Sequence, residues 1–327
     1  MFARGAGAGV AVLLSLVPHL VRAEEDIRIP PPVSGRSAGG TTPLLPADLL
    51  ARLGLLEARL ENIRTYMGRS KSLPPLIRLE EAEPREVYAQ AIIFHGRVQQ
   101  LGFEQMRSAR EELPRIDRPP GAADIMEVLN ATLYRVLQLE RHFGIQKPVI
   151  EEAQPSSTTP TEVFNVVLEA GQLAHELLDE KTTSSRVYSV ILFGLQLARV
   201  LHAERAPRFL PEPAPFIPAK TPGDVYQVLL EAFEATRTLN EQLDHPGPKL
   251  VVREYQRDVV PDDVLELAGI LLSQQVRLHL DLLGRFPDLP FVDFTRKLPS
   301  HSFQRASELK AILESLARAK LVKKRKR

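Results

Sequence analysis

The sequence predicts an all-α fold: an eight-helix repeat or bundle with long proline-rich connecting straps. Three observations predict it. A helix-start motif recurs at near-constant spacing, an apolar stripe follows each copy, and proline-rich stretches separate the copies. The chain has 327 residues, 44% apolar and 25% charged, which suffices for one large core or two smaller ones. Its 27 prolines are about 8% of the 327 residues, which exceeds the usual share of about 5%.

The start motif is Pro-x-(Asp/Glu) followed by two apolar residues, with variation between copies. Proline suits the first helical position, where a backbone N–H has no partner inside the helix. Thr159 and Thr221 precede two of the prolines, and Glu162 and Asp224 follow three residues later, as in a capping box. Successive starts lie 38 or 39 residues apart, with one step of 24. The expected starts are Pro46, Pro84, Ala122, Pro160, Ser184, Pro222, Pro261 and Pro299.

An apolar stripe occupies positions 3, 7, 10, 14 and 17 after each start. This spacing places the side chains on one face of a helix, as in the seam of a bundle, and Leu56 and Leu229 should be almost fully buried. Gln275 is the clearest polar interruption of the stripe. The residue four positions after most starts is large, which predicts a repeated packing contact; a row of ligand-stacking side chains is the alternative.

The proline-rich straps are expected to be extended and ordered, because proline favours extended backbone and removes an N–H donor. A strap of about 14 residues can extend along the full length of a helix, so successive helices can run parallel. Only a few residues separate the fourth and fifth helices, which predicts an antiparallel hairpin there and a division into helices 1–4 (46–181) and helices 5–8 (182–319). The apolar strap residues expected to be buried are Leu76, Ile116, Val149, Phe216 and Phe291.

The N-terminal segment suggests export, and the C-terminal segment is basic. Residues 1–23 combine a basic start, an apolar run and Val21-Arg22-Ala23, the pattern of a cleaved signal peptide. An uncleaved N-terminal anchor is the alternative. We therefore expect a periplasmic or secreted protein, with residues 24–45 as an extended or disordered segment. Residues 320–327 form a basic tail, which we expect to be a frayed end. The alternative is contact with an anionic surface through Lys320, Lys323, Lys324, Arg325, Lys326 and Arg327.

The sequence shows no catalytic motif. There is no cysteine, which excludes disulfides, thiol catalysis and thiolate metal sites. No two of the helical histidines stand at i, i+3 or i, i+4, so we expect no metal and no cofactor. Acidic pairs such as Asp262 and Asp263 are expected to be solvated or to interact with helix ends. Asn130, His175 and Gln275 are the polar groups that a pocket between the helices would use.

These features favour a non-catalytic interaction or scaffold protein, since helical repeats build extended binding surfaces. A protein partner is expected and nucleic acid is not. A ligand-binding or sensory bundle is the alternative; an apolar cavity lined by at least two of Asn130, His175 and Gln275 would favour it. A helical enzyme that acts on the cell wall is a third reading, which a single buried Glu at the floor of a groove would favour.

Overall fold

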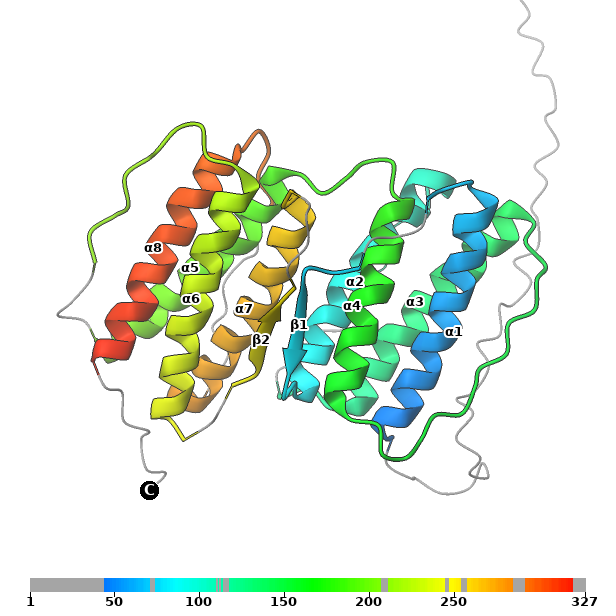
Figure 1. The fold of residues 1–327 in the computed structure, drawn as a ribbon, viewed down its shortest axis with the longest axis horizontal. Helices are drawn as coiled ribbons and strands as arrows, with labels where there is room; N and C mark the ends of the chain where they lie inside the picture. Colours follow the sequence, from blue (N-terminus) through cyan, green and yellow to red (C-terminus); the bar gives the residue numbers. More distant parts are fainter. Residues whose placement is uncertain are drawn as a thin grey trace, which may run out of the picture.

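In the part of the chain that the structure describes, the fold is an assembly of eight helices and two short strands (Figure 1). A computed structural model describes residues 44–70, 74–109, 111, 113, 118–206, 211–244, 247–253, 258–284 and 292–319. Each helix begins at the residue that the start motif predicts. The elements are α1 (Pro46–Tyr66), β1 (Ile77–Glu80), α2 (Pro84–Met106), α3 (Ala122–Phe143), α4 (Pro160–Leu177), α5 (Ser184–Arg205), α6 (Pro222–Gln242), β2 (Lys249–Val252), α7 (Pro261–Leu283) and α8 (Pro299–Arg318).

The recurring acid of the start motif has a local function. In α4, Glu162 accepts a hydrogen bond from the Thr159 N–H at 2.7 Å, and the Thr159 hydroxyl accepts one from the Glu162 N–H at 3.3 Å. Thr221 and Asp224 repeat both bonds in α6. The predicted capping boxes are therefore confirmed. In α1, α2, α3 and α7 the acid alone accepts the N–H of the residue before the helix, so the motif satisfies a backbone donor wherever it occurs.

The helices form two halves with the same packing pattern. In the first half α1 and α2 each pack against α3 and α4; in the second, α5 and α6 each pack against α7 and α8. Residues at equal depth in neighbouring helices touch, as with His95 of α2 and Thr132 of α3, so the helices within a half run parallel. The two halves run in opposite directions (Figure 1). Long straps make this possible because each returns the chain to the starting end.

The predicted stripe forms the core of each half. Leu56 and Leu229 have no exposed surface, as expected. The large residues four positions after the starts also pack inward, with Phe164 fully buried and Tyr188, Tyr226 and Leu265 buried. Their burial favours the packing contact over a row for ligand stacking. The eight apolar stripes therefore act as packing surfaces.

Two straps pair as a small antiparallel sheet, which the sequence analysis did not predict. β1 precedes α2 in the first half and β2 precedes α7 in the second, with Ile77 opposite Val252 and Glu80 opposite Lys249. The straps are extended, as expected, and extended segments from the two halves meet where α2 and α7 pack together. The halves are thus joined by a helix pair and by a sheet.

The predictions for individual strap residues have mixed outcomes. Leu76 is buried, and Val149 is half-buried against the core. The prediction for Phe216 is wrong: its side chain is 48% exposed because the strap turns its ring onto His301 at the surface. Ile116 and Phe291 lie outside the described residues.

The link between α4 and α5 reverses the chain direction, but the two helices do not pack along each other as a hairpin would. They belong to different halves, and α2 and α7 make the contact between the halves instead. Residues 1–43, which include the expected signal segment, and the basic tail 320–327 lie outside the described residues. No helix among those described has the length and apolar character needed to cross a bilayer.

Candidate functional site

The contact between the halves contains buried ionisable side chains of α2, α4 and α7. α2 and α7 cross in opposite directions, and Ile93 packs onto Gly269 at the middle of the crossing. A Cβ on Gly269 would stand 2.4 Å from Ile93 Cδ1, so the absence of a side chain permits this close approach. Ionic and polar side chains lie on both sides of this contact.

Arg97 is the centre of one cluster. Its guanidinium is buried and donates to Asp262 Oδ2 at 2.8 Å and to Glu266 Oε1 at 3.1 Å, both on α7. Asp262 Oδ1 also accepts the Thr182 hydroxyl at 2.7 Å and lies 3.2 Å from Nδ1 of His175. The cluster therefore joins α2, α4, α7 and the link between the halves.

The charges of this cluster do not balance if every group is ionised. Arg97 supplies one positive charge, whereas Asp262 and Glu266 supply two negative ones in a site with little exposed surface. Burial, the largest cause, together with the neighbouring carboxylates, raises the pKa of Glu266 to about 8, although Arg97 opposes the shift. Burial also lowers the pKa of His175. A neutral Glu266 and a neutral His175 leave one ion pair, Arg97 with Asp262.

A second chain of polar contacts lies on the other side of Gly269. Gln274 of α7 donates to Glu86 Oε1 of α2 at 2.7 Å, and its own oxygen accepts from Asn240 of α6 at 3.1 Å. Arg85 Nε lies 3.1 Å from Glu86. Burial raises the pKa of Glu86, and Arg85 opposes that shift. These contacts extend the link between the halves from α2 through α7 to α6.

This arrangement buries its charged groups and holds the halves together. Asp262 and Glu266 are each 1% exposed, and their carboxyl groups are directed at Arg97. Within the described ranges, no group of three His, Asp or Glu side chains could hold a metal ion. Chemically, the cluster can store or release a proton at Glu266 and can fix the relative position of α2 and α7.

The structure separates the three predicted pocket residues. Asn130 lies on α3 and accepts from Arg52, a fully buried residue of α1 that also pairs with Glu151 at 3.2 Å. His175 belongs to the cluster between the halves. Gln275 is 2% exposed and lies inside the second half, where neither amide atom has a hydrogen-bond partner among the described residues. No shared pocket brings two of them together among the hollows found.

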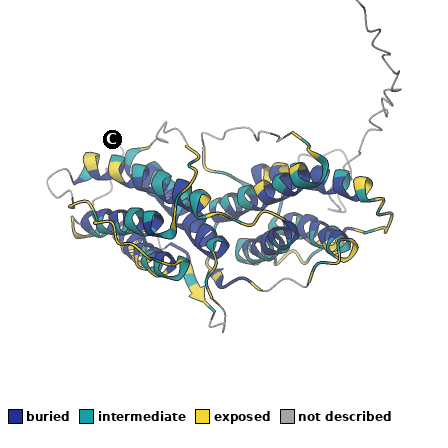
Figure 2. Ribbon diagram, turned by 90° about the horizontal axis from the view of Figure 1, so that it is seen from above, coloured by how far each residue is buried: buried dark blue, intermediate teal, exposed yellow. Residues whose placement is uncertain are grey.

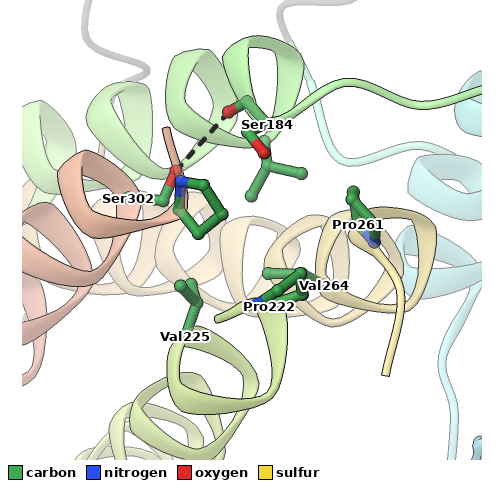
Figure 3. A pocket seen from close by; sticks show the side chains of 8 residues that line it. Ser184, Pro222, Val225, Pro261, Val264 and Ser302 are labelled. Carbon is green, nitrogen blue, oxygen red and sulfur yellow. Dashed lines mark hydrogen bonds between the residues drawn. The ribbon is translucent and has the colours of Figure 1, made fainter. Parts of the chain in front are cut away.

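Two hollows in the second half are small. One has no room for even a water molecule and is lined by Gln275, Gly194 and apolar side chains of α5 to α8. Another has a free volume of about 10 Å³ and lies where the starts of α5 to α8 converge (Figure 3). Its lining repeats one pattern, the first and fourth residues of each helix, and Ser302 donates to the Ser184 carbonyl across it at 3.5 Å. Both fall below the volume of about 300–1,000 Å³ typical of ligand pockets.

The sequence analysis missed the Arg97 cluster. Asp262 and Asp263 both stand in the first turn of α7, as expected, and Asp263 accepts a backbone N–H there. Asp262 is buried rather than solvated, because Arg97 of the opposing half and Thr182 of the link between the halves both reach it. Arg97 lies outside the apolar stripe of α2. Its burial could have been predicted only if the sequence had indicated a second buried face on this helix. The basic tail, with Lys320 and Arg327, lies outside the described residues.

Comparison of the chain with protein-family models, with curated proteins and with solved structures gives no match.

Proposed function

We propose that the protein is an exported, non-catalytic interaction or scaffold module that binds a protein partner through its straps. The observation that carries the proposal is where the exposed large apolar side chains lie. Of those described, only Tyr66 and Phe103 belong to helices; the other eight lie in the connections between helices. These are Ile150, Phe216, Ile217, Val251, Val252, Val260, Val292 and Leu298.

Three of these residues form what we call the strap patch: Phe216, Ile217 and Leu298. Phe216 stacks near the ring of His301 at a centroid distance of 5.2 Å, and the N–H of Leu298 is bonded to Nδ1 of the same histidine. The straps beneath are anchored: the Lys220 N–H donates to Ser300 and the Lys297 N–H to Ser185. An apolar patch on anchored backbone loses little conformational entropy on binding.

Export is part of the proposal, supported by the signal-like sequence of residues 1–23. The basic residues of the tail, 320–327, would add contact with an anionic membrane surface. The periplasmic or secreted location is tested directly by mass spectrometry of the exported protein, which should begin at Glu24. An intact Met1 in that pool would contradict it.

The binding role is tested with the double variant Phe216→Asp/Leu298→Asp used as bait in a periplasmic extract. A partner retained by the wild-type protein should be lost. The matched control is Tyr66→Asp, which alters an exposed apolar residue on a helix and should retain the partner. Thermal unfolding of each variant separates lost binding from lost folding. Equal retention by all three proteins would refute binding through the strap patch.

A ligand-binding bundle is the second candidate, favoured by Gln275. A buried amide without partners is costly, and a ligand with one polar group could satisfy it. The hollow beside it is small, which places this candidate second. Calorimetry with small apolar alcohols tests this candidate. Binding to the wild-type protein that is lost in Gln275→Leu would favour the ligand-binding function.

A further inference from the structure

Among the described residues, the outer edge of β2 has no pairing partner. Leu79 of β1 directs its N–H and carbonyl away from β2, because the side-chain amide of Asn165 binds both, at 3.3 and 3.2 Å. The Arg253 N–H donates to the Leu76 carbonyl, which fixes the alternation of the ladder. Leu250, opposite Leu79, and Val252 therefore direct their backbone groups away from β1. No described residue bonds to them there.

The two edges of the sheet differ in how far they are covered. Asn165 closes the edge of β1, and Ile77 and Leu79 are each 1% exposed. On β2, Val251 is 39% exposed and Val252 is 44% exposed, although Val252 shares a face with the buried Ile77. Figure 2 shows β2 as an exposed arrow at the border of the molecule. An open apolar edge invites pairing with another extended segment.

We propose that residues 27–29 of this chain add to the outer edge of β2 as a third, antiparallel strand. Their sequence, Ile27-Arg28-Ile29, repeats the pattern of Ile77-Arg78-Leu79, which already pairs with β2 on its other side. The strand covers the edge that β1 leaves open.

The register that β1 uses serves the new strand as well. Ile27 stands opposite Val252 and Ile29 opposite Leu250. Both isoleucines therefore lie on the same face of the sheet as these two residues and cover the exposed side chain of Val252. Asp26 then stands opposite Arg253, which is a pairing of opposite charges. Pro30 falls opposite Lys249, whose backbone groups face β1, so the missing N–H of the proline removes no bond of the ladder.

The chain direction and length fit this placement. β1 runs toward the starting end of the first half, where the Ala82 N–H meets Thr161 of α4. A segment antiparallel to β2 runs toward that same end, so residues 27–29 placed there would lead the chain toward the start of α1. The 14 residues 30–43 can span up to about 46 Å. The path past one helix and two strands is on the order of 30 Å.

A disulfide tests the pairing, because the chain contains no cysteine of its own. Arg28 and Val251 would form a non-hydrogen-bonded pair with Cα atoms about 4.5 Å apart, within disulfide range. Arg28→Cys/Val251→Cys should oxidise to a cross-linked monomer. Arg28→Cys/Ile150→Cys, which uses an exposed strap residue elsewhere, is the control and should stay reduced. Equal cross-linking of both pairs or of neither, or a disulfide-linked dimer of the first, would overturn the proposal.

Hydrogen exchange gives an independent measurement. In the wild-type protein the amides of Leu250 and Val252 should be protected. Ile29→Pro removes a ladder donor and should speed their exchange about tenfold or more. Ser34→Pro, outside the proposed strand, should leave it unchanged. If Ile29→Pro leaves the exchange rates of both amides unchanged, the pairing is overturned, even if the cross-link forms.

Discussion

The guanidinium of Arg97 lies directly over Gly171: a Cβ on that glycine would stand 2.8 Å from Nη1. Arg97 is held on its other side by Asp262 and Glu266, so it cannot withdraw without breaking an ion pair. Gly171 is thus the residue of α4 that allows the buried charges of α2 and α7 to meet.

Gly171→Ala should destabilise the protein by about 1–3 kcal/mol, because the added methyl displaces a buried, paired cation. Chemical denaturation followed by circular dichroism measures the change. Gly96→Ala is the matched control, since nothing lies within 4 Å of the position of its Cβ on α2. The control should gain up to about 1 kcal/mol from helix propensity alone. A Gly171→Ala protein that gains as much would show that Arg97 moves freely.

Glu266 should make stability fall as the pH rises. Its pKa is about 8 in the folded protein, well above the ordinary carboxyl value of 4.5. Between these values the folded state holds a proton that the unfolded chain has released, so its contribution is complete below about pH 4.5 and lost through pH 8. Glu266→Gln should flatten the decline of unfolding free energy over that range. Burial raises the pKa of Glu57 to about 7, so the difference between variant and wild type is the quantity to compare.

Two neighbouring glutamines of α7 should respond oppositely to replacement by leucine. Gln275→Leu removes a buried amide without hydrogen bonds and should stabilise the protein by about 1–2 kcal/mol. Gln274→Leu breaks the bonds to Glu86 and Asn240 and should destabilise it by about 1–3 kcal/mol. Thermal and urea unfolding measure both. A loss of stability in Gln275→Leu would mean that its amide has a partner, such as a bound water or ligand.

Leu229→Ala tests the core that the stripe predicts. Leu229 has no exposed surface, so truncation should cost about 2–5 kcal/mol through lost burial and a new cavity. Leu298→Ala, at a residue 60% exposed, should change stability by less than about 0.5 kcal/mol. Similar losses from both substitutions would contradict the assigned core.

The helices were predictable because their signals are local. The start motif needs only four residues to satisfy a backbone donor, as Thr159 and Glu162 do, and the stripe needs only a helical period. The contact between the halves was not predictable because its partners are far apart. Arg97 and Asp262 are 165 residues apart, and the pairing of Ile77 with Val252 also joins distant straps. In each pair, the local sequence of one residue does not indicate which distant residue it contacts.

The parallel course of the four helices within each half has an electrostatic consequence. Every helix carries about half a positive charge at its start and half a negative charge at its end, so four aligned helices add to roughly two charges at each end of a half. Such a dipole would be unfavourable alone, and the acids at the helix starts offset only part of it. Because the second half runs the opposite way, the positive end of each half lies beside the negative end of the other. The reversal between α4 and α5 thus makes each half the counter-dipole of its neighbour, and their attraction favours the antiparallel arrangement before any side chain at the contact is counted.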